Sequence, residues 1–279
     1  MNPLDRFEFS QSSLQDYVDC RRRFWLRYNQ RIAWPAVPAE PARENERHMQ
    51  RGERFHRLAQ QYLLGVPADR LACMADADED VHLRLWWQNF EDSVPRLLSG
   101  QRFVETTLAA PLDCYRLVAK YDLVQVQPDG RVQIFDWKTS LRRPRSSVLR
   151  ARLQSRVYPY LLVQAGAALT GGRPVAPEQI EMIYWFAEPT QPPERIAYSR
   201  AQWQADDKYL RGLVSETRAL PPESYDMTHK TESCAYCVYR SLCDRGACAG
   251  DLQNEAFEDD QNIQAGLTFD LEQIAEISF

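Results

Sequence analysis

The sequence predicts an α/β protein in which a mixed central sheet is flanked by helices. Two observations carry this prediction. Helix-like and strand-like segments follow one another in the order helices, three strands, helix, two strands, helix, an order typical of a sheet covered on both faces. The 279 residues are also 44% apolar and 11% aromatic, which is enough for a substantial core.

The N-terminal third of the chain is predicted to be helical. Ser12 and Gln15 have the spacing of a capping box and mark the start of a first helix. A proline-rich stretch over residues 33–43 then indicates a loop. The rest of this third is predicted as helices over residues 47–64 and 81–98 with a loop over 67–80 between them.

A β-hairpin is predicted at the centre of the chain. Its strands cover residues 117–126 and 131–137, and Pro128-Asp129-Gly130 supplies the turn between them, because proline presets one dihedral angle and glycine accepts a positive one. The remaining predicted elements are a strand over 102–109, a helix over 148–168 with Pro159 as a kink, strands over 179–186 and 195–199, and a helix over 202–219.

The charges of this hairpin are unusual for its position. Asp122 interrupts an apolar run in the first strand, and Asp136 and Lys138 leave the second strand on the same face. Two carboxylates brought together by a hairpin favour a bound cation, and a neighbouring lysine fits hydrolysis of a phosphodiester. The alternative is an ordinary edge hairpin whose charged side chains are solvated.

Composition gives further expectations about compartment and partners. No apolar run reaches the length of a membrane span, and charged residues near the N-terminus break any signal-peptide pattern. A soluble, cytoplasmic protein is therefore expected. The net charge is −5, yet residues 251–279 hold eight acids and no base, so the remainder carries 34 basic and 31 acidic residues.

Arginines gather at two places in the sequence. One group follows Lys138 (Arg142, Arg143, Arg145, Arg150, Arg152 and Arg156), and another surrounds Cys20 (Arg21, Arg22, Arg23 and Arg27). Such groups are usually solvated surfaces, but beside a phosphodiester-cleaving centre they are suited to bind backbone phosphates.

Seven cysteines are an odd number for a disulfide framework, and a cytoplasmic chain would keep them reduced. Cys234, Cys237 and Cys243 form a C-x2-C-x5-C pattern, and Cys20 lies near the other end of the chain. Four such thiolates suit either zinc or an iron–sulfur cluster. Cys73, Cys114 and Cys248 are scattered and are interpreted as ordinary small residues.

Four short motifs in a fixed order give the chain a family resemblance. They are Gly52-x3-His56 on a predicted helix, Asp122 in the first hairpin strand, Asp136-x-Lys138 in the second, and Gln154-x3-Tyr158 on the following helix. This set resembles the RecB-like branch of the PD-(D/E)XK nuclease superfamily. With the four cysteines added, it is most similar to the iron–sulfur members, namely CRISPR-associated RecB-like exonucleases and AddB-type nuclease domains. The resemblance covers about residues 10–245.

The resemblance implies a fold and a set of site residues. The fold would be restriction-endonuclease-like, with a cysteine-ligated layer joining the N- and C-terminal segments. The metal ligands for Mg²⁺ or Mn²⁺ would be His56, Asp122, Asp136 and the main-chain carbonyl of Trp137, with Lys138 catalytic. Gln154 and Tyr158 share a helix face and would line the same site.

The resemblance also favours a [4Fe-4S] cluster on Cys20, Cys234, Cys237 and Cys243, with zinc as the alternative. A single nuclease domain is then expected over residues 1–250, followed by an acidic tail over 251–279. The expected function is metal-dependent hydrolysis of single-stranded or frayed DNA ends in repair, recombination or CRISPR adaptation, with a helicase or an adaptation protein as partner. A non-catalytic iron–sulfur module that binds DNA is the alternative from another class.

Overall fold

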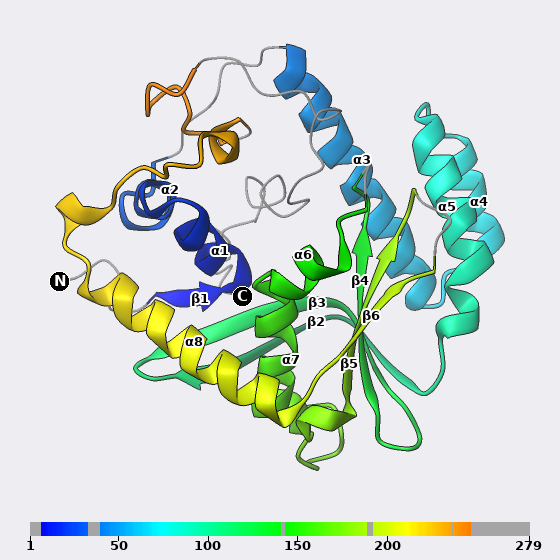
Figure 1. The fold of residues 1–279 in the computed structure, drawn as a ribbon. Coiled ribbons are helices and arrows are strands. Elements are labelled where there is room, and N and C mark those ends of the chain that lie inside the picture. Colours follow the sequence, from blue (N-terminus) through cyan, green and yellow to red (C-terminus); the bar gives the residue numbers. More distant parts are fainter. Residues whose placement is uncertain (1–6, 33–39, 141–142, 189–191, 236, 247–279) are drawn as a thin grey trace, which may run out of the picture.

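A six-stranded mixed sheet forms the centre of the protein in the computed structural model, which describes residues 7–32, 40–140, 143–188, 192–235 and 237–246 (Figure 1). The strands are β1 (Glu8–Ser10), β2 (Gln101–Leu112), β3 (Tyr115–Val126), β4 (Val132–Lys138), β5 (Ile180–Phe186) and β6 (Glu194–Ala197). Their order is β1-β3-β4-β5-β6, with β2 also paired to β3. The β1–β3 and β4–β5 pairs are parallel and the other pairs are antiparallel, so the predicted mixed sheet is confirmed.

Strand β3 pairs with three other strands, β1, β2 and β4, and its two edges are paired differently. One edge pairs with β2 over nearly its whole length. The other edge pairs with β1 only up to Val118 and with β4 only from Leu123 onward. Residues 119–122 of β3 therefore lie where β1 has ended and β4 has not yet joined. We call this stretch the β3 gap.

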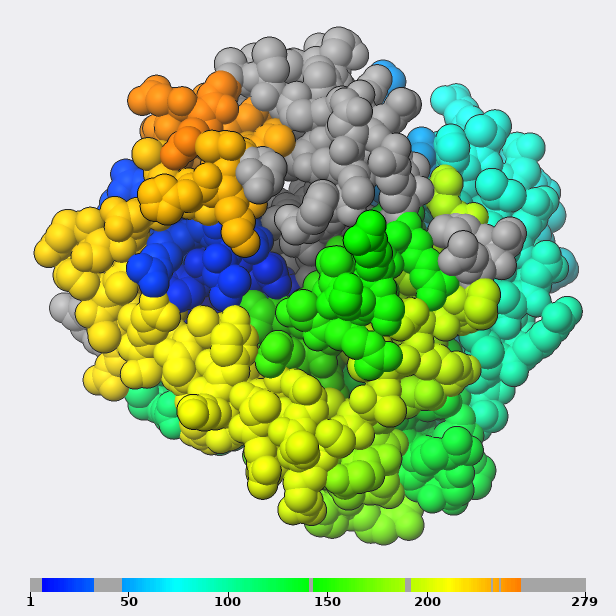
Figure 2. All heavy atoms as spheres, viewed as in Figure 1, coloured from blue at the N-terminus to red at the C-terminus, as the bar shows by residue number. Residues whose placement is uncertain are grey.

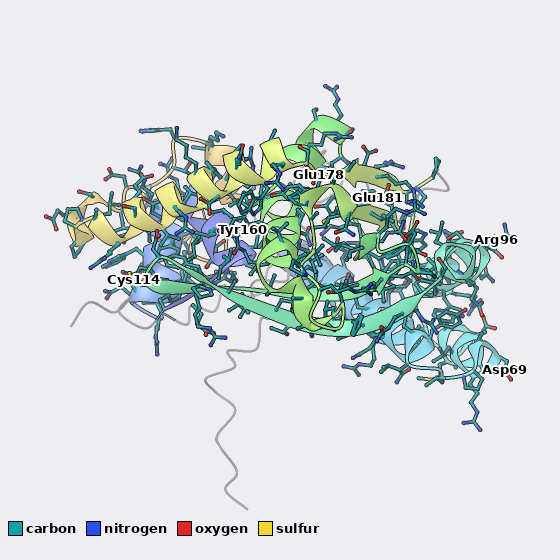
Figure 3. The ribbon with its side chains drawn as sticks, turned by 90° about the horizontal axis from the view of Figure 1, so that it is seen from below. Asp69, Arg96, Cys114, Tyr160, Glu178 and Glu181 are labelled. Atoms are coloured by element: carbon teal, nitrogen blue, oxygen red, sulfur yellow. The ribbon has the colours of Figure 1, made fainter. Side chains whose placement is uncertain are left out.

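Helices α1 (Gln11–Asp19), α7 (Gln154–Ala165) and α8 (Arg200–Ala219) supply apolar residues to one face of the sheet. Tyr17, Leu161 and Leu210 are buried in the same core as Leu117 and Ile134 of the strands. Figure 3 shows α7 and α8 together on one side of the sheet. The hydroxyl of Ser199 caps α8 by accepting from the backbone N–H of Gln202 at 3.2 Å.

The opposite face is covered by α3 (Glu40–Leu63), α4 (Ala68–Asp76) and α5 (Val81–Ser93). Its core is rich in aromatic rings: Phe55 of α3 stacks on Trp185 of β5 at 5.6 Å, and Phe90 of α5 lies edge-on to Trp137 at 5.3 Å. Large aromatic side chains bury much apolar area and restrict the angle at which a helix can pack. This core therefore fixes α3 against the end of β4, where the charged residues lie.

The two ends of the described chain meet beside α1. Helix α2 (Arg21–Phe24) follows α1, and the N–H of Arg22 donates to the carbonyl of Asp226 at 3.1 Å. The hydroxyl of Tyr239 donates to the carbonyl of Ile32 at 2.9 Å. Figure 1 shows the segment before residue 247 beside α1 and α2, and Figure 2 shows the same segment bordering the surface of these helices.

Several expected boundaries were wrong. The stretch predicted as the loop 67–80 contains helix α4, and the helix predicted over 148–168 is divided into α6 (Ser146–Ala151) and α7. The division comes before Leu153 rather than at Pro159, which lies inside α7. The first helix is capped by Ser10 and Ser13, which replace the predicted Ser12 and Gln15. No described helix is long and apolar enough to cross a membrane.

Candidate active site

Asp122 occupies the β3 gap, and it lies opposite a distorted position of β2. Glu105 of β2 stands across from it with a φ of 50°, in the left-handed region, and the two residues form no strand pair. The regular alternation of side chains is broken here: Tyr121 faces the α7 side of the sheet, whereas Leu123, two residues later, faces the α3 side. Asp122 lies between these opposite orientations, and its carboxylate reaches across to β4 by accepting the N–H of Trp137 at 2.8 Å.

The backbone of β4 also presents a carbonyl to this gap. In a strand, the N–H and C=O of one residue point to the same side, and those of the next residue point to the opposite side. The Lys138 carbonyl accepts from Ala187 on the β5 side at 2.8 Å, whereas the Trp137 N–H points to Asp122. The Trp137 carbonyl therefore faces the β3 side, as its predicted ligand role requires.

Asp136 and Lys138 form a buried pair at the end of β4. Their residues are 5% and 3% exposed, and the Lys138 ammonium lies 3.0 Å from Asp136 Oδ2. The other carboxylate oxygen, Oδ1, accepts from the side-chain amide of Gln154, which is 2% exposed. The strand thus brings the carboxylate and the lysine to one face, and α7 adds Gln154 to the same group.

His56 reaches the gap from α3. Its Nδ1 lies 3.5 Å from Asp122 Oδ1. Gly52 lies one turn earlier on the same helix face, and a Cβ at this glycine would be 3.0 Å from Thr139 Oγ1. The glycine of the G-x3-H motif therefore allows α3 to approach the residue that follows the catalytic lysine candidate, and this approach brings His56 to Asp122.

The two carboxylates have pKa values displaced in opposite directions. Burial raises the pKa of Asp136, and the nearby Asp122 charge adds to this effect although Lys138 opposes it. Burial acts in the same sense on Asp122, but His56, the Trp137 N–H and Lys138 together hold the pKa of Asp122 below its usual value. Asp122 is therefore the firmly ionised member of the pair.

The pKa of His56 reflects the same charges. Burial by itself would lower it, but the Asp122 carboxylate outweighs this effect, with help from Asp136 and Glu105, and raises the pKa to about 9. A cation at the site would compete with this proton, because a histidine must be neutral to bind a metal.

Tyr158 lies one turn after Gln154 on α7 and is also buried. Its ring is 4.8 Å from that of Tyr121, whose hydroxyl donates to the Tyr158 carbonyl at 2.9 Å. Burial and the charges of Asp136 and Asp122 raise the pKa of Tyr158 far above its ordinary value, so its hydroxyl keeps its proton. Tyr158 therefore faces the two carboxylates as a neutral hydroxyl.

Three buried atoms of this group fit a divalent cation with its water ligands. His56 Nε2 and Gln154 Oε1 have no hydrogen-bond partner in the described part of the chain, and Asp136 Oδ2 has only the Lys138 ammonium. Carboxylate, carbonyl and water oxygens suit Mg²⁺, and an added imidazole also suits Mn²⁺. Across the described ranges, however, no three His, Cys, Asp or Glu side chains are arranged tightly enough to hold a metal ion.

Sequence reasoning missed two residues around the site. Thr139 and Tyr121 connect segments far apart in the chain, because Thr139 lies against Gly52 of α3 and Tyr121 donates to the carbonyl of Tyr158. Glu105 of β2 also lies near the site. It is 2.6 Å from the ammonium of Lys120, and its charge reaches His56. A left-handed φ has no sequence signal at a glutamate, which explains why its position was not predicted.

The four candidate cysteines line one cavity between α2 and the C-terminal segment. Cys20 is the residue that joins α1 to α2, and its Sγ accepts the backbone N–H of Arg23 at 3.4 Å. The cavity wall comprises Cys20, Cys234, Cys237 and Cys243 together with Arg23, Met227, Ser233, Tyr239, Arg240 and Arg245. None of these four thiols is in a disulfide. Two residues 214 positions apart in the sequence, Cys20 and Cys234, thus face a common space.

Cys73 and Cys114 do not line this cavity. Cys73 and Cys114 are exposed, and Figure 3 shows Cys114 at one end of the molecule, at the turn between β2 and β3. Cys248 lies outside the described residues, as does the acidic segment 251–279. The prediction that Cys73 and Cys114 stand apart from the cluster pattern agrees with this placement.

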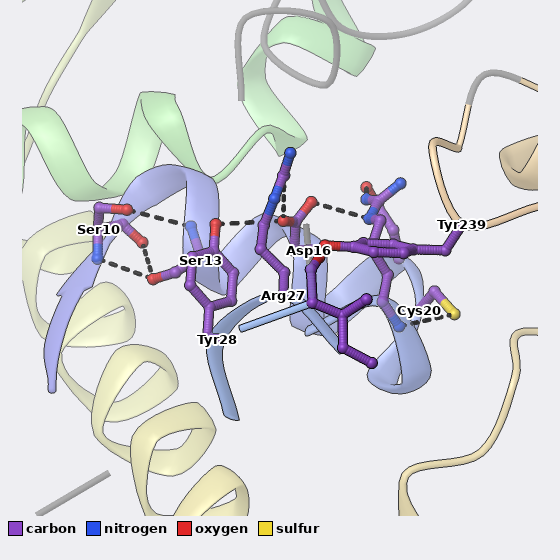
Figure 4. Close-up of polar contacts among 10 residues, drawn as sticks. Ser10, Ser13, Asp16, Cys20, Arg27, Tyr28 and Tyr239 are labelled. Carbon is purple, nitrogen blue, oxygen red and sulfur yellow. Dashed lines mark hydrogen bonds and ion pairs between the residues drawn. The ribbon is translucent and has the colours of Figure 1, made fainter. Parts of the chain in front are cut away.

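Several arginines predicted to face DNA are instead tied to carboxylates. Arg143 pairs with Glu194 at 3.0 Å, and Arg156 pairs with Asp206 at 2.7 Å. Arg23 and Arg27 are largely buried and both pair with Asp16 at 2.8 Å, and Figure 4 shows Arg27 at the Asp16 carboxylate. These four residues stabilise the fold around the site, and phosphate binding by them would require breaking an ion pair.

Comparison with known proteins agrees with the fold. The family model of the PD-(D/E)XK nuclease superfamily matches residues 8–244. The protein therefore belongs to the PD-(D/E)XK nuclease superfamily, and it is a nuclease by that membership. Members of this superfamily generally use divalent metals such as Mg²⁺.

Two solved structures are similar to this chain. One, from Eubacterium rectale and described as a "Putative exonuclease", has a TM-score of 0.51 and 11% identity, and it covers 95% of this chain and 94% of that one. Another, SSO0001, has a TM-score of 0.40 and 15% identity, with 85% of each chain covered. At such identities the first likeness concerns the fold alone, and the second is too distant to support an argument. No curated protein matches the sequence.

Proposed function

We propose that this protein is a divalent-metal-dependent deoxyribonuclease that hydrolyses phosphodiester bonds at single-stranded or frayed DNA ends. The observation that carries this proposal is the gathering of His56, Asp122, Asp136 and Lys138 at the β3 gap. In this proposal His56, Asp122, Asp136 and the Trp137 carbonyl hold Mg²⁺ or Mn²⁺. When bound, the cation polarises water and the phosphate oxygens.

The residues of the chain would each contribute to the reaction in a distinct way. Asp122 is ionised and is held by the Trp137 N–H, so it offers a fixed negative charge for the cation. Lys138 is buried with its ammonium beside Asp136, where it would stabilise charge that develops on the attacked phosphate. Gln154 fixes the orientation of Asp136, and Tyr158 supplies a neutral hydroxyl within the same group.

An iron–sulfur cluster in the cysteine cavity belongs to the same proposal. The donor set fits, because four thiols and no histidine or carboxylate side chain line the described cavity. A zinc ion needs all four sulfurs about 2.3 Å from one point, whereas each cysteine of a four-iron cluster binds a different iron. The described chain holds no group of three His, Cys, Asp or Glu side chains tight enough for either metal site, so the choice of [4Fe-4S] over zinc rests on resemblance to the iron–sulfur members. Its role here would be to fasten α2 to the C-terminal segment.

The wider assignment rests on resemblance of motifs. The RecB-like branch accounts for the histidine on α3 and the glutamine and tyrosine on α7 together with the cysteines. We therefore place the protein in DNA repair, recombination or CRISPR adaptation, where a helicase or an adaptation protein would present the DNA end. We treat residues 1–250 as one nuclease domain and 251–279 as an acidic tail.

The test is an anaerobic digestion of end-labelled DNA with the protein loaded with iron and sulfide. Single-stranded, blunt and frayed duplex substrates and an RNA of the same sequence would be compared with Mg²⁺ and with Mn²⁺. The proposal expects shortening of single-stranded or frayed DNA that needs a divalent cation and that Asp136→Asn abolishes. Asp129→Asn, in the exposed hairpin turn, is the matched control and should cleave like the wild type.

Two results would contradict the proposal in different ways. Cleavage retained by Asp136→Asn would show that the catalytic centre lies elsewhere. Tight DNA binding by the wild type without cleavage under any condition would favour the non-catalytic DNA-binding module. If the labelled products were only fragments produced by internal cuts, the protein would still be a nuclease, but it would be an endonuclease rather than an exonuclease.

A further inference from the structure

Helix α7, which carries Gln154 and Tyr158, begins without a side-chain cap from its own segment. The N–H of Leu153, the residue that precedes the helix, instead donates to the side-chain Oε1 of Gln15 on α1 at 3.4 Å. The next residue is Gln154, whose amide holds Asp136. The start of α7 is thus fixed from α1, one residue away from a contact to the proposed catalytic carboxylate.

The other end of the Gln15 amide is linked to the wall of the cysteine cavity through Asp19 and Arg23. Its Nε2 donates to Asp19 Oδ1 at 2.8 Å, and Asp19 Oδ2 accepts from Arg23 Nη2 at 2.7 Å. An amide has a donating end and an accepting end. Gln15 therefore uses one end for α7 and the other for a chain of contacts that leads to Arg23.

Arg23 forms part of the cavity wall with the four cysteines. It is 5% exposed, its Nε pairs with Asp16, and its backbone N–H donates to Cys20 Sγ. Figure 4 shows Asp16 and Cys20 within this network, with Arg27 and Tyr28 on the other side of the Asp16 carboxylate. A change in the position of Cys20 would therefore act directly on α2 and on Arg23.

We propose that Gln15 is a positioning residue that couples occupancy of the cysteine cavity to the catalytic centre, through Asp19 and Arg23 on one side and Leu153, Gln154 and Asp136 on the other. This inference rests on the proposed function. A group bound to Cys20 fixes the junction of α1 and α2, and Arg23 and Asp19 then hold Gln15 in the orientation that caps α7. An empty cavity leaves that junction free to shift.

The lengths of the links identify where the coupling breaks. The contacts within α1 and α2 are 2.7–2.8 Å, whereas the contact between Gln15 and Leu153 is 3.4 Å, near the limit for a hydrogen bond. The longest link joins two separate elements, so it is lost first when α1 moves. Its loss frees the first turn of α7 and lets Gln154 turn away from Asp136.

The test measures the affinity of the catalytic centre for Mn²⁺ alone, from the electron paramagnetic resonance signal of free Mn²⁺ in anaerobic protein. Each protein is measured with the cluster loaded and after its removal by an iron chelator. Gln15→Met removes both ends of the link. Gln15→Glu keeps an acceptor for Leu153 but repels Asp19. Gln164→Met, at an exposed position of α7, is the matched control.

We call the series of contacts from Arg23 through Asp19 and Gln15 to Leu153 and Gln154 the relay, and it predicts a specific pattern of Mn²⁺ affinities. Removing the cluster weakens Mn²⁺ binding about tenfold in the wild type and in Gln164→Met, within the usual range of coupling between sites. Loaded Gln15→Met already binds about tenfold more weakly and does not change on removal of the cluster. Gln15→Glu should have the same Mn²⁺ affinity with the cluster loaded and with the cluster removed, because its contact with α7 no longer depends on Asp19.

The outcomes separate the relay from the proposed function. Equal Mn²⁺ affinity in loaded Gln15→Met and wild type, or an equal weakening of both on removal of the cluster, would overturn the relay while DNA cleavage by the wild type upholds the nuclease. A Gln15→Glu protein that responds to cluster removal as the wild type does would also overturn it. A loaded wild type that neither binds Mn²⁺ nor cleaves DNA would overturn both proposals.

Discussion

Replacement of Lys138 by methionine tests whether the buried pair at the end of β4 is as strongly coupled as its geometry indicates. Methionine keeps most of the apolar stem and removes the ammonium that lies 3.0 Å from Asp136 Oδ2. Asp136 is then left as a buried carboxylate with the Gln154 amide as its remaining partner. Removing one partner of a buried ion pair typically costs 3–5 kcal/mol. Because Gln154 stays in place, we expect a loss near the lower end, about 3 kcal/mol at pH 8.

The pH dependence of this loss has a definite sign. Burial already raises the pKa of Asp136, and the variant lacks the lysine that opposes this rise. A carboxyl whose folded-state pKa is raised favours the folded state below its unfolded pKa and loses that stability as the pH rises through the folded value. Stability of the Lys138→Met protein relative to the wild type should therefore recover on acidification, by at most about 1.4 kcal/mol per pH unit.

Urea unfolding followed by tryptophan fluorescence at pH 8 and pH 6, without added divalent cation, measures both quantities. Lys208→Met, at an exposed position of α8, is the matched control and should change the unfolding free energy by less than about 0.5 kcal/mol. A Lys138→Met protein that loses less than about 1 kcal/mol at pH 8 would refute the reasoning. So would a loss that grows on acidification.

Three further predictions follow from contacts at the two sites. Gly52→Ala gains up to about 1 kcal/mol of helix propensity but places a Cβ 3.0 Å from Thr139 Oγ1. The thermal midpoint should therefore change little while the cleavage rate falls, and adding Thr139→Ala should restore the rate. A cleavage rate unchanged by Gly52→Ala alone would show that the close approach of α3 to Thr139 is unimportant. In metal-free protein, the pKa of His56, raised to about 9, should stabilise the folded state below pH 6.5, and this stability should be lost as the pH rises through 9, by at most about 3 kcal/mol. The unfolding free energy of His56→Gln, measured with urea, should lack this loss. A His56→Gln protein whose stability varies with pH as the wild type's does would contradict the Asp122 contact. Cys237→Ser should reduce the iron bound per chain and lower the thermal midpoint, measured by iron analysis and calorimetry, and full iron content would exclude this cysteine as a ligand.

The hairpin that carries the candidate site could be predicted from the sequence because that part of the fold is local. The turn residues, the alternation of the strands and the placing of Asp122, Asp136 and Lys138 all lie within a stretch of 22 residues, 117–138. The alternation placed Asp136 and Lys138 on one face, and the structure brings them to within 3.0 Å. The sequence pattern was therefore sufficient to predict the contacts that are made within this hairpin.

The gap that exposes Asp122 could not be predicted in the same way. It exists because β1, a three-residue strand, pairs with β3 only up to Val118, and β4 joins only at Leu123. A strand this short has too few residues to show alternation, and it is fixed by long-range pairing. The contact of Gly52 with Thr139 also depends on how α3 packs on the sheet, which a motif search does not reveal.

The helices show a similar division. Helices α3 and α8 were predicted, although α3 begins seven residues earlier than expected, whereas α4 was missed because its acidic end looked like a loop. The break before Leu153 has no proline or glycine to mark it. It is this break that separates α6 from α7 and puts Gln154 at the start of a helix, close to Asp136.

The central claim is that the group at the β3 gap performs metal-dependent cleavage, and one paired measurement tests it most directly. Single-turnover cleavage of labelled single-stranded DNA would be followed over a range of Mn²⁺ concentrations for the wild type and Asp122→Asn, with DNA binding measured by anisotropy on the same samples. Asparagine can still accept the Trp137 N–H, so the local backbone should be preserved. We predict saturable, Mn²⁺-dependent cleavage by the wild type and a loss of at least about a thousandfold in Asp122→Asn with DNA binding unchanged. Equal cleavage rates in the two proteins, or binding without cleavage in the wild type, would contradict the account.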